Sequence, residues 1–427
     1  MTEKRRADLY LPAALALTGL AFLLPALQMP GDCREFLLVG LGALAGLGAA
    51  PFALRLLRLP VDRLLYAVAA VLAGLGLATL TRLQAAKDAF GPLAQHQLLS
   101  LYLSLAVLAG GIYFGRHLLS LCHYRYLFLC GALLLMGATV PFGRMVGGAK
   151  AWLDLGLFSL QPSEIARPVV LFFLASYLGQ HQPLLRAVGP EAPPLWRRRW
   201  LLGPVLAMWG LALAALLLQR DLGTAVLYYG GFLGLLYLAS GRPAHLLGGA
   251  ALGAAGCLAA AVFVEHARTR FLIWLHPLAF INGAGFQTSR GLFALAAGGL
   301  LGVGPGRGLP EATPAVHTDL IFTVLGEELG LAGGLAVLLL YLILVARGMA
   351  LAVGSRDRVG YLFGAGLAFT LGLQVLLIVG GNLGIFPLTG VTLPLLSYGG
   401  SSLAATFFCL GVLSGLGAAR GGTGLAD

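Results

Sequence analysis

The sequence begins MTEKRRADLYLPAALALTGLAFLLPALQMP (Met1–Pro30), a short basic start followed by a long run of apolar residues. A helix needs roughly twenty mainly apolar residues to cross the hydrocarbon core of a bilayer, and this run has about that length. The basic start is also typical of a signal peptide, but no A-x-A cleavage site follows the run. We therefore interpret the stretch as a retained first membrane-spanning helix.

The composition of the whole chain agrees with this interpretation. Of the 427 residues, 59% are hydrophobic and 11% are charged, and the mean hydropathy is +0.88. Soluble domains contain about 25% charged residues, so the composition indicates a polytopic membrane protein. The five cysteines show no metal-like spacing, and we interpret them as small packing residues.

Eleven further apolar segments predict an all-α bundle of about twelve membrane-spanning helices. Many of the segments are rich in Gly and Ala, which allows helices in lipid to approach closely. The expected spans are residues 10–30, 36–57, 64–84, 95–115, 124–146, 161–181, 200–218, 220–240, 243–264, 319–346, 358–381 and 398–419.

The distribution of basic residues predicts the orientation of this bundle. If the N-terminus is cytoplasmic, more than half of the 28 Lys and Arg residues fall in cytoplasmic segments, mostly short loops close to helix ends, as the positive-inside rule requires. Both termini are then expected in the cytoplasm. The net charge of +11 is explained largely by this topology and by the anionic inner leaflet. No soluble domain is expected that could carry a nucleic-acid-binding patch.

The outer face then displays four unusual loops, at residues 147–160, 219–221, 265–318 and 382–400. The longest contains RTRFLIWLHPLAFINGAGFQTSRGLFALAAGGLLGVGPGRGLPEATPAVHTD (Arg268–Asp319), rich in Gly, Pro and Arg. Loops of this length without regular structure of their own are uncommon and usually functional. We therefore expect this extracytoplasmic loop to carry the functional site.

Charged residues of both signs gather in and beside these loops. Ionisable residues at helix ends in membranes usually pair or line a cavity, and Glu164 and Arg167 have the spacing to pair on one helical face. Two interpretations stay open: ion pairs that tie helix ends together, or a basic cavity for an anionic substrate such as a phosphorylated lipid head group. The basic members are Lys150, Arg167, Arg220, Arg268, Arg270, Arg290 and Arg307, and the acidic members are Asp154, Glu164, Asp221, Glu311 and Asp319.

Four motifs in these loops resemble the SEDS family of shape, elongation, division and sporulation proteins (RodA/FtsW/SpoVE). The motifs occur in the family's order over about residues 64 to 420. They are GAKAWLDLGLFSLQPSEIAR (Gly148–Arg167), QRDLGTA (Gln219–Ala225), HTDLIFTVLGEELG (His317–Gly330) and FPLTGVTLPLLSYGGSS (Phe386–Ser402).

The resemblance implies a ten-helix SEDS core over residues 61–420, preceded by two additional helices in residues 1–60 and followed by a cytoplasmic tail, residues 421–427. It implies a bacterial cytoplasmic-membrane protein that polymerises lipid II into glycan strands at the outer face, for cell shape or division. It also implies a class B penicillin-binding protein as partner and, in an older view, lipid II flipping. The matching positions expected to bind substrate are Lys150, Trp152, Glu164, Arg167, Gln219, Asp221, Arg270, Gln287, His317, Thr318, Ser397 and Tyr398.

Some of the matching motifs also have structural interpretations. Gln161–Glu164 is typical of a helix start, because Pro and Glu are favoured in the first turn. Residues 386–402 could fold a re-entrant loop, whose backbone must be buried in protein or line a wet cavity. Its hydroxyl groups could equally bind sugar or phosphate.

One departure from the family concerns catalysis. The family carries an Asp in the large loop, proposed as the catalytic base, and alignment on the HP and GAGFQ sequences places Phe280 at that position. Neither Asp nor Glu occurs between Glu265 and Glu311. Glycan polymerisation requires a sugar 4-hydroxyl to attack an anomeric carbon that carries a lipid pyrophosphate, and a positioned base contributes typically 10²- to 10⁴-fold. Phe280 cannot act as a base.

Three other residues are candidates for the base: His276, Glu311 and Asp319. His276 has a suitable pKa range, although a lone loop histidine is more often a hydrogen-bonding residue. Thr318 and Asp319 could instead cap the helix that follows. A divalent metal, Mg²⁺ or Mn²⁺, could stabilise the departing pyrophosphate, but the sequence identifies no ligands for it.

Two hypotheses follow: a peptidoglycan glycosyltransferase with a divergent active site, or a catalytically inactive member that binds or flips lipid II or serves as a scaffold for a penicillin-binding protein. The missing loop carboxylate separates them. An ordinary secondary transporter fits less well, because the sequence has no inverted repeat with paired broken helices.

Overall fold

The computed structural model describes residues 3–86, 91–146, 149–154, 156, 159–186 and 195–418. The expected tail, residues 421–427, lies outside these ranges. Within them, each of the twelve expected spans is occupied by a long helix. These helices are α1 (Glu3–Gln28), α2 (Cys33–Leu56), α3 (Arg63–Ala86), α4 (Leu93–Arg116), α6 (Arg125–Phe142), α7 (Pro162–Arg186), α8 (Leu195–Leu218), α9 (Leu222–Ser240), α10 (Pro243–Phe263), α13 (Ile321–Val353), α14 (Arg358–Asn382) and α15 (Gly400–Ala418).

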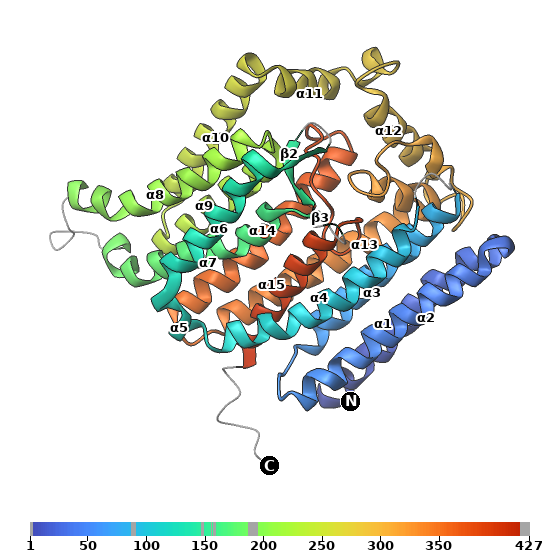
Figure 1. The fold of residues 1–427 in the computed structure, drawn as a ribbon, viewed down its shortest axis with the longest axis horizontal. Helices are drawn as coiled ribbons and strands as arrows, with labels where there is room; N and C mark the ends of the chain where they lie inside the picture. The colour runs from blue at the N-terminus through green and yellow to red at the C-terminus, as the bar shows by residue number, and fades with distance from the viewer. Residues whose placement is uncertain are drawn as a thin grey trace.

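These helices confirm the predicted membrane architecture. Ten stretches in the described part of the chain are long and apolar enough to cross a bilayer, including α6 together with the short α5 (Leu118–Leu121) that precedes it. The other two long helices are α7 and α8. In α8, the shorter segment Leu206–Leu218 is apolar. In Figure 1, α1 begins and α15 ends on the same side of the bundle, as an even number of spans requires.

The helices pack as one bundle to which the N-terminal pair belongs. In Figure 1, α1 and α2 lie along α3 and α4 at one edge. The Tyr66 hydroxyl donates to the Leu47 carbonyl at 2.6 Å, and Tyr102 donates to the Gly42 carbonyl at 2.8 Å. Since both acceptors lie in α2, hydrogen bonds as well as apolar packing hold α2 against α3 and α4.

The long loop differs from the expectation, because much of it is helical. It contains α11 (Glu265–Leu275), a 3-10 turn η4 (Pro277–Phe280), α12 (Phe286–Gly298) and a second 3-10 turn η5 (Pro310–Ala312). In Figure 1, α11 crosses the outer end of the bundle from α10 to α12. The Gly and Pro residues that suggested an irregular loop stand between these short helices, where they end one piece and begin the next.

The outer face also carries a small β-sheet beside the helices that make up most of the protein. A three-stranded antiparallel sheet has the order β1 (Arg144–Val146), β2 (Ala149–Asp154) and β3 (Ser159–Leu160). The expected span 124–146 accordingly ends at Phe142. Strands of two to six residues are too short for alternation of apolar and polar residues to be recognised in sequence.

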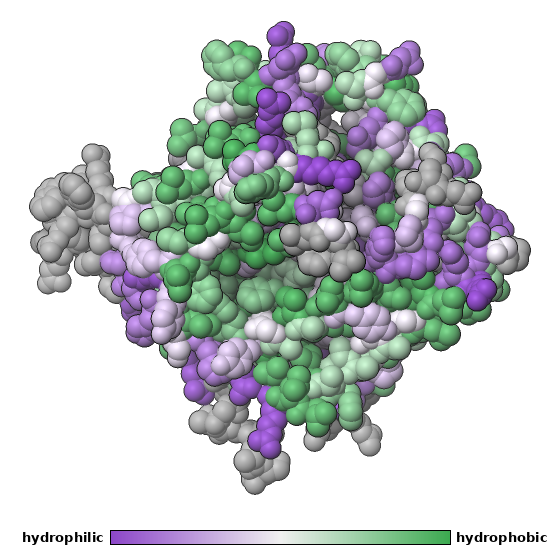
Figure 2. Space-filling model, in the orientation of Figure 1, coloured by the Kyte–Doolittle hydropathy of each residue, from purple (hydrophilic) through white to green (hydrophobic). Residues whose placement is uncertain are grey.

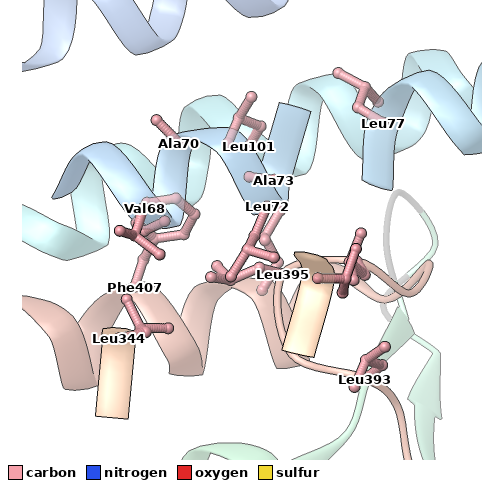
Figure 3. Packing of buried hydrophobic residues seen from close by; sticks show 14 of the residues in the cluster. Val68, Ala70, Leu72, Ala73, Leu77, Leu101, Leu344, Leu393, Leu395 and Phe407 are labelled. Atoms are coloured by element: carbon pink, nitrogen blue, oxygen red, sulfur yellow. The ribbon is translucent and has the colours of Figure 1, made fainter. Parts of the chain in front are cut away.

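The non-helical segment between α14 and α15 is buried in the bundle. Leu393 and Leu395 pack with Leu72 and Ala73 of α3 in the core shown in Figure 3. The hydroxyl of Tyr341 in α13 donates to the Pro394 carbonyl. The segment therefore forms the buried, irregular backbone that a re-entrant loop requires.

A cluster of buried charges holds the end of the long loop. Glu328 of α13 accepts a hydrogen bond from the Gly306 amide at 2.9 Å, and Glu327 accepts one from the Leu309 amide at 3.0 Å. Arg82 of α3 lies 3.3 Å from Glu328. Because all three side chains are buried, these contacts fix the loop against α3 and α13.

Hydrophobic and hydrophilic residues separate on the surface as a membrane protein requires. Figure 2 shows hydrophobic residues across much of the middle of the molecule and hydrophilic residues grouped toward its ends. Exposed apolar side chains on α2 and α10, such as Leu41 and Leu252, are suited to contact with lipid.

The packing of α4 against α15 predicts a large difference between two adjacent glycines. A Cβ atom at Gly111 would lie 2.3 Å from the Phe408 carbonyl oxygen, whereas one at Gly110 would meet nothing within 4 Å. We expect Gly111→Leu to destabilise the fold by about 1–3 kcal/mol or more, because backbone atoms yield poorly to overpacking. Thermal unfolding in detergent measures this, with Gly110→Leu as matched control. Equal melting temperatures would contradict the described packing.

Candidate active site

Arg270 of α11 is held over the segment between α14 and α15. Its Nη1 donates to the carbonyl oxygens of Leu388 at 3.2 Å and Thr389 at 2.9 Å. A Cβ atom at Gly390 would lie 3.4 Å from Arg270 Nη2 and 3.7 Å from Asp319 Oδ2. Gly390 has a φ of +72°, which glycine adopts at little cost. The segment between α14 and α15 thus brings the side chains of Arg270 and Asp319 together beside Gly390 at the outer face.

Asp319 lies just before α13 and has an altered acidity. Burial raises the pKa of Asp319 to about 6, while a hydrogen bond from Thr318 and the charge of Arg270 lower it and Asp221 raises it. The interpretation of Thr318–Asp319 as a helix cap is wrong, because Leu320 is the N-cap of α13 and makes no side-chain cap. The Asp319 carboxylate is therefore free of that structural task.

Asp221 acts on both Arg270 and Asp319 and also lies close to the residue that precedes α7. One carboxylate oxygen accepts the Thr224 amide at 3.1 Å and caps α9. The other lies 3.4 Å from Nε2 of Gln161, which immediately precedes α7. Asp221 contributes to the pKa of both Arg270 and Asp319, so two carboxylates and one guanidinium interact here. Burial lowers the pKa of Arg270, and the two carboxylates act to raise it.

The predicted pair of Glu164 and Arg167 is confirmed. Arg167 Nη2 lies 2.8 Å from Glu164 Oε2, and the side chains are only 8% and 1% exposed. The predicted helix start is also confirmed, since Pro162 is the first residue of α7. The pair lies within the first turns of this helix, beneath Gln161.

The burial of this pair predicts a large loss of stability when one charge is removed. Arg167→Met should destabilise the fold by about 3–5 kcal/mol, because it leaves the Glu164 carboxylate buried without its partner. Arg167→Lys keeps the charge and should lose much less. Chemical denaturation in detergent compares the two variants. Equal stability of the Met and Lys variants would show that Glu164 does not depend on this partner.

Lys150, Trp152 and Gln219 are brought together at the sheet. Lys150 and Trp152 lie in β2, and the Lys150 amide donates to the Gln219 carbonyl at 2.9 Å. The side chains of Lys150 and Gln219 are directed elsewhere: Lys150 Nζ donates to the Val140 carbonyl at 2.5 Å, and Gln219 Nε2 to the Met136 carbonyl at 3.0 Å. In this structure the Lys150 side chain fastens the sheet to α6, and the Gln219 side chain fastens the junction between α8 and α9 to α6.

A second contact joins the segment before α13 to the segment between α14 and α15. It is formed by His317, Thr318, Ser397 and Tyr398. Ser397 Oγ donates to the Thr318 carbonyl at 2.6 Å, and the Tyr398 amide donates to the His317 carbonyl at 2.8 Å. The rings of His317 and Tyr398 meet edge to face, with centroids 6.0 Å apart. Burial lowers the pKa of His317, so its ring is neutral at neutral pH. These contacts fix the position of Asp319.

The other candidate bases lie apart from these contacts. His276 is exposed at the end of α11, and Glu311 is exposed in η5. Phe280 ends η4 and is 37% exposed. Gln287 lies in the first turn of α12. Of the three candidates, Asp319 alone shares its surroundings with Arg270 and Asp221.

One residue near the site was missed from the sequence. Burial and the neighbouring charges of Arg270 and Arg220 lower the pKa of His266. His266 precedes Arg270 by four residues on α11, a spacing that places both on one helical face. The helical spacing of His and Arg could have revealed it, had the loop been recognised as helical.

The described residues contain no group of three or more His, Cys, Asp or Glu side chains that could hold a metal ion. Asp221 offers oxygen ligands. Mg²⁺ commonly binds through one or two carboxylates together with substrate phosphates, so this residue fits a metal that the substrate helps to hold.

The fold and the site together define a class: a polytopic membrane protein with a polar, charged site at one end of its helices. The chain belongs to the FtsW/RodA/SpoVE family of cell cycle proteins, which matches residues 62–420. The match leaves out the whole of α1 and α2, as the resemblance implied.

Similar proteins extend this assignment. A RodA of Mycobacterium tuberculosis, named a peptidoglycan glycosyltransferase, is 37% identical over 97% of this chain and 90% of its own length, so the similarity reaches the N-terminal helices. Stage V sporulation protein E of Bacillus subtilis is 33% identical over 67% of this chain and 76% of its own length. The Thermus thermophilus RodA crystal structure has a TM-score of 0.62 and 30% identity, covering 84% and 97% of the two chains. A peptidoglycan synthase complex contains a chain with a TM-score of 0.68 and 31% identity, covering 84% and 98%.

Proposed function

We propose that this protein is a peptidoglycan glycosyltransferase that polymerises lipid II into glycan strands at the outer face of the bacterial cytoplasmic membrane, with both termini in the cytoplasm. The observation that carries the proposal is the approach of Arg270 and Asp319 to each other at Gly390, with Asp221 close enough to act on both electrostatically. Family membership and the names of the mycobacterial relatives support it.

In this mechanism Asp319 is the general base. Its carboxylate accepts the proton of the sugar 4-hydroxyl as that oxygen bonds to the anomeric carbon of the second sugar. The bond between that carbon and the pyrophosphate oxygen breaks, and the electron pair leaves with the pyrophosphate. A base is most effective when its pKa lies near the working pH, and burial has moved that of Asp319 to about 6.

Arg270 stabilises the leaving group. Two backbone carbonyls hold its Nη1, so the guanidinium is oriented before the substrate arrives. Preorganised cations at the position where charge develops lower the barrier without reorganisation. Mg²⁺ or Mn²⁺, held by Asp221 and the pyrophosphate, would supply further charge neutralisation.

The alternative is a catalytically inactive member that binds or flips lipid II or serves as a scaffold for a penicillin-binding protein. The observation that favours it is Phe280 at the position of the family's loop carboxylate. A class B penicillin-binding protein is the proposed partner under both hypotheses, since a similar chain is found in a complex that coordinates polymerisation and cross-linking.

The two hypotheses are distinguished by comparing the turnover of lipid II by the wild type and by Phe280→Asp. If Asp319 is the base, the purified wild-type chain should form glycan strands, and Phe280→Asp should change the rate little. If the chain is an inactive member, the wild type should bind labelled lipid II without forming strands. Strand formation by Phe280→Asp alone would support the second hypothesis.

A further inference from the structure

A cavity lies at the opposite end of the bundle from the candidate active site. It has a volume of about 380 Å³ and is lined by Leu119, His123, Arg125, Tyr126, Gln180 and Val359, among others. Gln180 and Glu164 both lie in α7, sixteen residues apart, which corresponds to about 24 Å along the helix axis. The cavity is therefore independent of the site around Asp319. It lies at the starts of α6 and α14 and the end of α7, on the side of the two termini.

Arg125 is oriented within this cavity by four neighbours. Its Nη1 donates to Gln180 Oε1 at 2.6 Å and lies 3.3 Å from Ser176 Oγ. The guanidinium carbon lies 5.2 Å from the centre of the Tyr126 ring and 5.7 Å from that of Tyr177. Among the described residues, these contacts use Nη1 and the faces of the guanidinium group, which leaves the edge formed by Nε and Nη2 for an anion.

The surroundings combine positive charge with apolar surface. His123 is exposed beside Arg125, and Arg358 precedes Val359 at the start of α14. Asp357 also lies close enough to the lining residue Cys122 to act on it electrostatically. Its side chain caps α14 by accepting the Gly360 amide at 2.7 Å. Leu119 is 56% and Tyr126 44% exposed, which gives the cavity an apolar edge at the level where the membrane-spanning part of α6 begins.

We infer that this cavity binds the head group of an anionic phospholipid from the leaflet on the side of the termini. Arg125 binds the phosphate through Nε and Nη2, because a guanidinium edge matches two phosphate oxygens. His123 adds a polar contact at the mouth, and Leu119 and Tyr126 contact the acyl chains. A free phosphate lacks the apolar part that these two residues would cover.

The test is retention of phosphatidylglycerol by the purified full-length protein, measured by native mass spectrometry. We expect Arg125→Gln to weaken binding about tenfold or more, since it removes a charge-assisted pair of hydrogen bonds. Arg116→Gln is the matched control: Arg116 ends α4 on the same side of the bundle, is exposed, and donates to the Arg58 carbonyl. It should retain the lipid as the wild type does.

A second variant and two competing ligands make the test specific for an anionic phospholipid. Leu119→Glu places an acid at an exposed position beside the cavity and should also abolish retention, whether or not Arg125→Gln folds. Phosphatidylcholine and inorganic phosphate should not displace phosphatidylglycerol. Equal retention of phosphatidylcholine, displacement by millimolar inorganic phosphate, or equal losses in Arg125→Gln and Arg116→Gln would overturn the inference.

Discussion

Asp319→Asn is expected to lower the rate of glycan formation from lipid II by about 10²- to 10⁴-fold, the usual contribution of a positioned base. The amide keeps the shape of the side chain but cannot accept the proton of the sugar hydroxyl. Binding of lipid II should be little changed, because Arg270 remains. The measurement is the initial rate of strand formation at saturating lipid II, together with the affinity for lipid II.

The pH dependence of this rate gives an independent readout. Burial raises the pKa of Asp319 to about 6, so the carboxylate is protonated below that pH and ionised above it. A base acts only when ionised. The rate should therefore fall about tenfold for each unit below pH 6 and level off above it. Glu311→Gln, which alters an exposed carboxylate in η5, is the control and should keep the wild-type rate and profile. A wild-type rate in Asp319→Asn would exclude this residue as the base.

Arg270→Ala is expected to lower the same rate by about 10²- to 10³-fold, the usual effect of removing one preorganised group that stabilises developing charge. It also removes the donor from the Leu388 and Thr389 carbonyls. Since the charge of Arg270 lowers the pKa of Asp319, its loss should move the pH profile upward.

That upward movement distinguishes a role in the reaction from a loss of folding, which would reduce the amount of active protein at every pH. Arg268→Ala is the matched control, because Arg268 lies exposed on the same helix, two residues away. Arg270→Lys retains the charge without the two-pronged geometry and should fall between wild type and Ala. Equal losses in Arg268→Ala and Arg270→Ala would contradict the assigned role.

The membrane architecture could be predicted from sequence because lipid imposes a simple rule. Each span needs roughly twenty apolar residues, and all twelve expected spans contain a long helix. The outer segments follow no such rule. Helix α11 carries Arg and His as well as apolar residues, and β2 is six residues long. Neither gives a periodic pattern strong enough to stand out from the surrounding Gly and Pro.

The candidate site could be predicted in its parts but not in its arrangement. The spacing of Glu164 and Arg167 predicts their ion pair, because both residues lie on one helix. The meeting of Arg270, Asp319 and Asp221 depends on how three distant segments approach each other, and Gly390 permits this through a backbone conformation that no local pattern indicates. The surroundings of the candidate bases distinguish them, and these surroundings depend on the fold. Asp319 lies beside the opposite charge of Arg270 and the like charge of Asp221, whereas His276 and Glu311 are exposed.

The most direct test of the proposed activity is strand formation from labelled lipid II by the purified chain. Wild type and Asp319→Asn should be compared side by side, with and without Mg²⁺ or Mn²⁺ and a partner transpeptidase. We expect glycan strands from the wild type under at least one of these conditions and a rate at least about a hundredfold lower from the variant. Absence of strands from the wild type under every condition, with lipid II binding retained, would contradict the proposed activity.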